Sequence, residues 1–397
     1  MKRFIAWGLL LLLMMGTVVF AKAEEARDIA AECKIKVSIY GDDKKKMLDD
    51  INRTMWETVF KGGFVEVTTK EDSPCQGVYI QWGQEPVDVV IQVPGEGEKE
   101  WVDVKTCTDK YFNQYISFDE PLTHFRVQSV RKDVQMGIIK LYVFSEGEVP
   151  SWVQRWQPFE GKADLMVLTA HPDDELLFMG GVIPYYNTVE EKNVIDVHVV
   201  RMAGYRKTEL LNGLWHCGVR AYPELPGGKF PDKYTMGKKE CLNIWGEEKL
   251  LEYVTEMIRK YQPDVIVTHD VDGEYGHGAH KACCYAVQKC VEYAADPKKY
   301  PASAKEYGVW QVKKAYIHLY EGELGQIDFD WRIPMEAFDG KTIHEITSEA
   351  FELHQSQYVT GTYAVEDFGA YDNSLFGLYY STVGPDTGMN DLFENID

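Results

Sequence analysis

The sequence predicts an α/β protein of two domains, in which a Rossmann-like domain with a parallel sheet follows an antiparallel β-sandwich. Up to about residue 150, short runs of alternating apolar and polar residues are separated by turns rich in Gly, Pro, Asp and Ser, which is typical of antiparallel sheets. Beyond about residue 160, continuous apolar runs such as Leu165–Ala170 alternate with helical patterns, which indicates a buried parallel sheet. Ser145–Pro150 is a linker by composition.

Residues 1–23 show the three parts of a secretory signal peptide. Lys2 and Arg3 precede a mostly apolar run over residues 4–20, and Ala21-Lys22-Ala23 is a small-residue cleavage site. We therefore expect cleavage before Glu24, no transmembrane segment afterwards, and a secreted, extracellular protein that is free or held at the cell surface. An uncleaved membrane anchor is the alternative, because the run is close to the shortest length that spans a bilayer.

The composition is that of a soluble globular protein, with 45% hydrophobic and 26% charged residues. The formal net charge of −21 argues against nucleic acid and anionic membrane surfaces as partners, since both repel a strongly acidic protein. Eight cysteines are an even number in a chain expected to reach an oxidising compartment, which predicts some disulfides. The alternative is that several of them are small buried hydrophobic residues. The oligomeric state is not predicted.

The expected sandwich domain spans residues 24–150 and is built from short strands of period two, with one helix predicted over residues 49–60. Its layout resembles the discoidin-like, galactose-binding sandwiches that are appended to secreted carbohydrate enzymes. That resemblance implies a domain that supports glycan targeting rather than chemistry, with a structural brace as the alternative. The predicted strands cover residues 34–40, 77–82, 87–93, 101–105, 112–118, 124–130 and 137–144.

The expected α/β domain spans residues 151–397 and alternates strands with helices. Strands are predicted at 165–170, 194–200, 262–269 and 314–320. Helices are predicted at 206–216, 249–261, from 277 through 290, and 342–354.

Residues 171–175, His-Pro-Asp-Asp-Glu, follow the first of these strands directly. Pro172 disfavours helical geometry at His171, so the strand ends there and the chain turns. An imidazole and three carboxylates thus lie at the carboxyl end of a parallel strand, where open α/β sheets bind ligands. His171 with an Asp two or three positions on suits a divalent metal such as zinc, and the adjacent Asp is free to act as a base. A turn with helix-capping acids is the alternative.

A second polar motif follows the strand that ends at His269. It reads Tyr275-Gly-His277-Gly-Ala-His280 and leads into a helical pattern. His277 and His280 are three positions apart, so they share a face at the start of that helix. One of them can bind a metal while the other faces a substrate.

The two motifs together resemble the signatures of the PIG-L superfamily of N-acetylglucosaminyl-phosphatidylinositol de-N-acetylases, also called LmbE-like zinc deacetylases. The first signature is carried by residues 170–175 and the second by residues 275–280, which are similar to the mycothiol-pathway deacetylase. The resemblance covers residues from about 162 to the C-terminus and leaves out the first third. It implies a Rossmann-like fold and zinc-dependent removal of an acetyl group from an amino sugar.

The resemblance also implies a role for each residue of the first motif and its partners. His171, Asp174 and His280 are the expected zinc ligands, which leave an open position for water. Asp173 is the expected general base toward that water. Glu175 is expected to support the ligands from behind.

The remaining residues are expected around the substrate. His277 and Tyr275 are candidates to stabilise the oxyanion, and His277 is also a candidate to protonate the leaving amine. Arg206, paired with Glu209 in an R-x-x-E pattern, is expected to help bind substrate, with an ordinary surface ion pair as the alternative. Residues 354–357 match an H-x-S-Q element near the family's cleft, although a lone histidine in an apolar helix, such as His354, is more often structural. Residues 376–384 are aromatic and are expected to wall the sugar site.

The sequence predicts a zinc-dependent N-deacetylase that acts on an N-acetylglucosamine-type sugar in an extracellular or cell-wall glycan. Two alternatives remain open at this point. One is a different metal-dependent amidase or esterase built on the same site. The other is a secreted carbohydrate-binding protein whose metal site no longer turns over. The particular glycan is not determined by the sequence.

Overall fold

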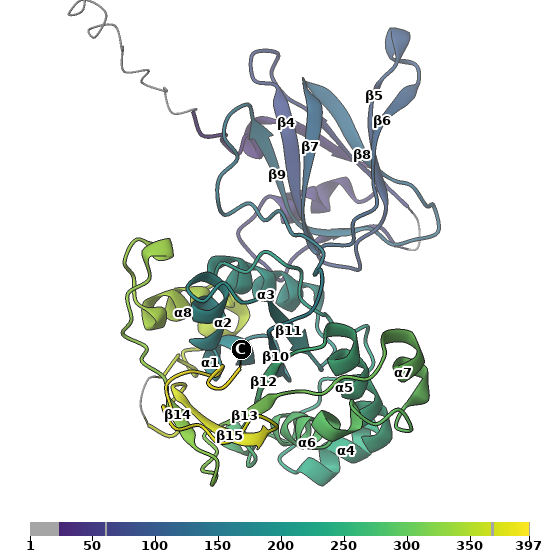
Figure 1. Ribbon diagram of the computed structural model, residues 1–397. Helices are drawn as coiled ribbons and strands as arrows, with labels where there is room; N and C mark the ends of the chain where they lie inside the picture. Colours follow the sequence, from purple (N-terminus) through teal and green to yellow (C-terminus); the bar gives the residue numbers. More distant parts are fainter. Residues whose placement is uncertain (1–23, 60–61, 367–368, 397) are drawn as a thin grey trace, which may run out of the picture.

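The computed structural model describes residues 24–59, 62–366 and 369–396, and it places a β-sandwich against a larger α/β domain (Figure 1). The signal peptide predicted over residues 1–23 lies outside the described residues. Across the described ranges, no helix combines the length and the apolar character needed to cross a membrane.

The sandwich consists of two antiparallel sheets whose apolar side chains meet between them. Strand β8 illustrates the pattern, because Phe125 and Val127 are fully buried while His124, Arg126 and Gln128, which alternate with them, are partly exposed. The five-stranded sheet has the order β1 (Lys34–Val37), β3 (Phe64–Thr68), β8 (His124–Ser129), β5 (Val89–Pro94) and β6 (Trp101–Cys107). The four-stranded sheet has the order β2 (Trp56–Glu57), β9 (Gly137–Ser145), β4 (Cys75–Trp82) and β7 (Asn113–Leu122).

The helix predicted over residues 49–60 is wrong. The Asp49 carboxylate accepts hydrogen bonds from the Ile51 N–H and the Thr54 hydroxyl, both at 3.0 Å, which closes a turn in place of a helix. The chain then extends, and Trp56 pairs with Ile138 in β9. The helical elements in the first domain are the short 3-10 segments Ala30–Glu32, Gly41–Met47 and Glu96–Glu98.

The second domain is built on a six-stranded mixed sheet. Its order is β11 (Val194–His198), β10 (Leu165–Thr169), β12 (Val265–Thr268), β13 (Lys314–His318), β15 (Leu375–Ser381) and β14 (Gln326–Asp328). The first four of these strands are parallel, whereas β15 runs antiparallel to both of its neighbours, β13 and β14. The prediction of a parallel sheet thus fails at one edge, because the helical crossovers that make strands parallel stop after β13. The aromatic segment expected to wall the sugar site forms most of β15, which lies between β13 and the edge strand β14.

Helices cover both faces of this sheet, and the alternation of side chains along β10 shows how. Leu165 and Val167 pack with the helices that lie toward the sandwich, while Met166 and Leu168 pack with helices on the opposite face. The first group is α1 (Asp174–Leu177), α2 (Val182–Thr188), α3 (Gly204–His216) and α8 (Ile343–Glu352). The second group is α4 (Lys238–Trp245), α5 (Glu247–Tyr261) and α6 (Gly278–Tyr293). Two shorter helices, α7 (Pro301–Tyr307) and α9 (Gln355–Tyr358), complete the set, with 3-10 turns at Glu274–Gly276 and Glu336–Phe338.

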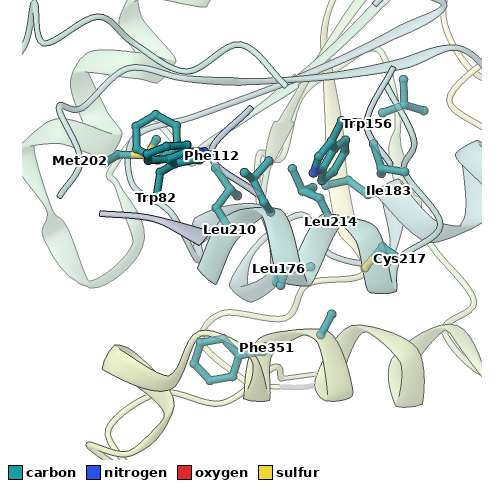
Figure 2. Close-up of a cluster of buried hydrophobic side chains, with 14 of the residues drawn as sticks. Trp82, Phe112, Trp156, Leu176, Ile183, Met202, Leu210, Leu214, Cys217 and Phe351 are labelled. Carbon is teal, nitrogen blue, oxygen red and sulfur yellow. The ribbon is translucent and has the colours of Figure 1, made fainter. Parts of the chain in front are cut away.

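Helix α3 joins the two domains through a shared apolar core. Trp82 and Phe112 of the sandwich lie beside Met202 and Leu210, and all four belong to one continuous buried cluster (Figure 2). Next to this cluster, the Asn113 side chain donates to Oδ1 of Asn212 on α3 at 3.0 Å. The helix that carries Arg206 is therefore packed directly on the sandwich.

All eight cysteines are free, and seven of them are buried. The prediction of disulfides is therefore wrong for this structure, and the alternative of buried hydrophobic residues describes it. Cys283 and Cys290 on α6, for example, belong to the core beneath the sheet, where burial raises the pKa of the Cys290 thiol to about 12.

Candidate active site

The candidate site lies at the carboxyl ends of β10 and β12, which are neighbours in the sheet. From β10 the chain passes to β11 on one side, and it later returns to β12 on the other side. This reversal of direction makes the crevice between β10 and β12 the topological switch point of the parallel strands, where open sheets bind ligands. Both sequence motifs begin at this crevice.

Three of the predicted residues bring one ligand atom each to a common point. His171 Nδ1 lies 3.1 Å from Asp174 Oδ2, His280 Nε2 lies 3.3 Å from the same oxygen, and the two nitrogens are 3.3 Å apart. A tetrahedral zinc site with metal–nitrogen distances of about 2.0–2.1 Å would place neighbouring ligand atoms about 3.3 Å apart. All three side chains are buried, and His, Asp and His suit a divalent metal. The residues present therefore fit a metal, and the metal assignment stays a prediction.

His269 also approaches this point, since its Nε2 lies 3.4 Å from Asp174 Oδ2. Its two nitrogens are both engaged, however. Nε2 accepts the N–H of Ala170 at 2.9 Å, and Nδ1 is 2.7 Å from Glu274. A nitrogen whose lone pair accepts a backbone hydrogen bond is not available to a metal, so His280 is the better ligand on the β12 side.

Glu274 is the main residue that the sequence reasoning missed. Its Oε2 accepts from Nδ1 of His269 and of His280, and its Oε1 accepts from Nδ1 of His318, each at 2.7 Å. Burial alone would raise the pKa of this carboxyl, but the histidines hold it well below its usual range. The Nδ1 contact leaves the Nε2 lone pair of His280 directed at the metal position. A glutamate six positions before the ligand was the signal available in the sequence.

Asp173 is held by its backbone as well as by its side chain. Its φ of 110° is left-handed, and its N–H donates to Glu175 Oε2 at 2.7 Å. Its Oδ1 is 3.0 Å from Nη2 of Arg206, which also donates to the Pro172 carbonyl. No hydrogen bond to Asp173 Oδ2 is found among the described residues. Burial raises the pKa of Asp173 to about 7, against the opposing charge of Arg206.

A buried network behind Asp173 holds Glu175 in place. Glu175 Oε1 lies 3.1 Å from Nε2 of His354, and its Oε2 lies 3.8 Å from Nε2 of His198, which is 2.7 Å from Asp196. All four side chains are essentially inaccessible to solvent. The supporting position predicted for Glu175 matches this geometry. His354, for which the sequence favoured a purely structural role, contacts Glu175 directly. No local signal marked His198 or Asp196, because both lie within the apolar strand β11.

Arg206 and Glu209 point to different partners. Glu209 is fully buried and accepts from the Ser356 hydroxyl at 2.6 Å and from its N–H at 3.0 Å. The surface ion pair considered as an alternative for these two residues is therefore wrong. Arg206 contacts Asp173 and lines the same small cavity as Asp173, His171 and His277, which is called the catalytic cavity from here on. Its role in substrate binding stays a prediction.

His277 caps the N-terminus of α6. Its Nδ1 accepts the N–H of Ala279 at 3.2 Å, so the proton of the neutral ring lies on Nε2. Burial, followed by the neighbouring His171 and His280, lowers the pKa of His277 to about 3. A neutral imidazole with Nε2–H facing a cavity is a hydrogen-bond donor to an oxyanion. The Tyr275 hydroxyl lies 3.5 Å from His280 Nε2, within the same group of side chains.

The cavity that these groups share has a volume of about 140 Å³. Its wall includes His171, Asp173, Arg206, Tyr275 and His277.

Comparison with known proteins identifies the fold family of this site. Residues 166–291 match the family model described as PIG-L, GlcNAc-PI de-N-acetylase. The 1D-myo-inositol 2-acetamido-2-deoxy-alpha-D-glucopyranoside deacetylase of Rhodococcus opacus is 30% identical over 205 residues, which are 43% of this chain and 68% of the relative. The chain belongs to the PIG-L family. A relative of the same name from Geodermatophilus obscurus is 28% identical to this PIG-L chain over 178 residues. These residues are 38% of this chain and 60% of the relative.

Two solved structures resemble separate parts of the PIG-L chain. The N,N'-diacetylchitobiose deacetylase of Pyrococcus horikoshii is 18% identical over 49% of this chain and 71% of that chain, with a TM-score of 0.35. A family 32 carbohydrate-binding module of C. perfringens is 17% identical over 30% of this chain and 98% of that chain, with a TM-score of 0.25. Both TM-scores are below 0.5, so neither resemblance bears on function.

Proposed function

We propose that this protein is a zinc-dependent hydrolase that removes the N-acetyl group from an N-acetylglucosamine-type amino sugar. The observation that carries the proposal is the position of Asp173, which lines the cavity together with His171 and directly precedes Asp174. Its Oδ1 is held by Arg206, while the Oδ2 of Asp174 meets His171 and His280 at the expected metal position. The PIG-L relatives from R. opacus and G. obscurus are named as deacetylases of an acetamido-glucopyranoside, which supports the same reaction here.

A divalent metal bound by the three ligands would polarise a carbonyl oxygen and lower the pKa of a water molecule. Asp173 then accepts a proton through Oδ2, while Arg206 holds Oδ1 and keeps the carboxylate from rotating away. The backbone of Asp173 is left-handed, and its N–H donates to Glu175. This conformation holds the base next to Asp174, so that Asp173 is not itself a metal ligand.

His277 and Tyr275 serve the substrate side of the cavity. The Nε2–H of His277 donates to the amide oxygen as negative charge develops on that oxygen. The hydroxyl of Tyr275, which lines the same cavity, is a second donor. The departing amine needs a proton when the C–N bond breaks, and Asp173, which has taken one from the attacking water, returns it to the amine. The neutral His277 ring keeps its Nε2–H, because giving it up would leave an imidazolate. Arg206 also lines the cavity, where it contacts Asp173 and is available to a sugar hydroxyl.

We further propose that the substrate is an extracellular or cell-wall glycan and that the protein is exported. The support for export is the charged start, apolar run and Ala-Lys-Ala sequence of residues 1–23. N-terminal sequencing of the protein recovered from its host tests this proposal. A mature chain that begins near Glu24 supports export, and a membrane-bound chain that retains Met1 supports the anchor.

Asp173→Asn separates a catalyst from the alternative, a secreted carbohydrate-binding protein with a non-catalytic metal site. Asn cannot accept the proton, and loss of a general base typically costs about 10²–10⁴-fold in rate. Acetate release from N-acetylglucosamine oligosaccharides should therefore collapse, while metal content and sugar binding remain. Asp119→Asn, on an exposed strand of the sandwich, is the matched control. A metal-loaded wild type that binds these sugars without releasing acetate would favour the binding protein.

A further inference from the structure

A large cleft lies between the sandwich and the PIG-L domain and is distinct from the catalytic cavity. It has a volume of about 700 Å³, compared with about 140 Å³ for the catalytic cavity, and the two share no lining residue. One wall is the face of β4 and β9, and the other is the C-terminal half of α3 with α8. Pockets of about 300–1,000 Å³ at domain interfaces are typical sites for small ligands.

The sandwich side of the cleft presents an exposed tryptophan that is fixed in orientation. Trp152 is 47% exposed, and its ring meets Tyr142 edge-on at 5.0 Å and Tyr79 edge-on at 5.9 Å between ring centroids. Its indole N–H makes no hydrogen bond within the described part of the chain. An aromatic ring that is held at its edges and open to solvent offers an apolar surface and a hydrogen-bond donor to one ligand.

The floor of the cleft is a set of amide side chains that are hydrogen-bonded to one another. Oδ1 of Asn212 accepts from Gln154 at 2.7 Å, from Asn113 at 3.0 Å and from Gln81 at 3.3 Å. Gln154 and Gln81 are only 3% and 8% exposed. These bonds orient the Asn212 amide and leave its Nδ2 donors without a partner among the residues that the structure describes. The cleft therefore contains fixed donors that require no rearrangement to meet a ligand.

The cations around the cleft are already engaged. Lys140 pairs with Asp50 at 2.8 Å, Lys341 pairs with Glu349 at 2.7 Å, and Arg220 donates to two backbone carbonyls at 2.9 Å. An anion would have to compete with these partners. A fixed aromatic surface, neutral amide donors and neutralised charges together suit a neutral, polyhydroxylated ligand.

We infer that this interdomain cleft is a second binding site, separate from the catalytic cavity, and that it binds a neutral oligosaccharide. The apolar C–H face of a pyranose ring packs on Trp152, and its hydroxyl or acetamido oxygens accept hydrogen bonds from Asn212 Nδ2 and the indole N–H. Helix α3 connects the two sites, because Arg206 near its start lines the catalytic cavity and Asn212 lines the cleft. About 9 Å of helix separates these two positions. An oligosaccharide held in the cleft is thereby kept close to the catalytic site.

Binding of the β-1,4-linked N-acetylglucosamine trisaccharide to the full chain tests this inference. The Asp173→Asn variant is used so that turnover does not consume the probe. Calorimetry should show saturable binding, and the indole N–H resonance of Trp152 should shift on addition of the trisaccharide. That resonance is the one missing from the NMR spectrum of Trp152→Phe.

Two cleft variants and one control locate the binding. Trp152→Ala should weaken binding at least tenfold. Asn212→Asp keeps an oxygen for the three amide donors and replaces the Nδ2 donors by a charged carboxylate oxygen, so it should also weaken binding while the fold is retained. Tyr40→Ala removes an exposed aromatic ring outside the cleft and should have no effect. Unchanged affinity in both cleft variants, or preferential binding of inorganic phosphate, would overturn the inference.

Discussion

Glu274 Oε2 accepts the Nδ1–H of His280 at 2.7 Å, and this contact directs Nε2 of His280 toward His171 and Asp174. The same glutamate binds His269 and His318, so it ties the ends of β12 and β13 to the start of α6. A single buried carboxylate thus sets both the ring orientation and the tautomer of the predicted ligand.

Glu274→Gln should weaken metal binding by about 10–100-fold, the range typical of losing a partner that supports a metal ligand. Gln is nearly isosteric, but its amide nitrogen cannot accept from a histidine N–H, so His280 is free to rotate or to change tautomer. Zinc competition titration against a chelator measures the effect. Glu240→Gln on the exposed face of α4 is the control, and equal zinc affinity in both variants would contradict the role assigned to Glu274.

His280→Ala and His171→Ala should each abolish stoichiometric zinc binding, whereas His277→Ala should retain about one zinc per chain, as expected for a three-ligand site with an open position. The reason is that Nδ1 of His277 is occupied by the Ala279 N–H and the ring faces the substrate side. Metal analysis of the purified variants decides the point. Full zinc occupancy in His280→Ala would shift the ligand assignment to His277 or His269.

Arg53→Ala should raise KM about 2- to 10-fold with little change in kcat, which corresponds to the about 0.5–1.5 kcal/mol of one hydrogen bond. Arg53 of the sandwich donates to the Ser356 carbonyl at 3.0 Å, and its guanidinium lies 5.7 Å from the ring centroid of Tyr205. These contacts brace the segment that carries Gln357 into the catalytic cavity, but they do not touch the metal ligands.

Steady-state kinetics of Arg53→Ala are best compared with those of Arg131→Ala. Arg131 is exposed and pairs with Asp133 on the sandwich surface. If both variants behave like the wild type, the first domain does not shape the substrate cavity, and its role is restricted to targeting or bracing.

Glu394→Gln should lower the melting temperature at neutral pH but not at about pH 2. Glu394 accepts the N–H groups of Thr387, Gly388 and Met389, and these bonds lower its pKa from 4.5 to about 2. Because the folded-state pKa is depressed, this stabilisation is present above about pH 4.5 and is lost as the pH falls toward 2. Melting curves of both proteins from pH 7 to pH 2 test the sign, and a difference that does not depend on pH would refute it.

The sequence alone determined the chemistry at the ends of two strands. His171, Asp173 and Asp174 follow an apolar run within a few residues, and His277 and His280 follow a second run after an intervening polar turn. Parallel strands present their carboxyl ends at one edge, so two such motifs must lie near each other whenever those strands are neighbours. The period-two runs of the first third likewise predicted strands, because side-chain alternation is a local property of extended backbone.

Tertiary structure decided what surrounds these residues. The contacts of Glu274 with His318, of Glu175 with His354, and of Arg53 with Ser356 each join segments far apart in the sequence. The apolar and polar periodicity of a single segment does not encode such pairs, because they depend on which buried faces meet when helices and sheets pack. The antiparallel strand near the edge of the sheet has the same cause, whereas the turn at residues 49–54 is local, because one aspartate side chain outweighed a helical pattern there. Local pattern specifies the reacting groups, and the packing of distant segments specifies their tautomers, their orientation and the cleft between the domains.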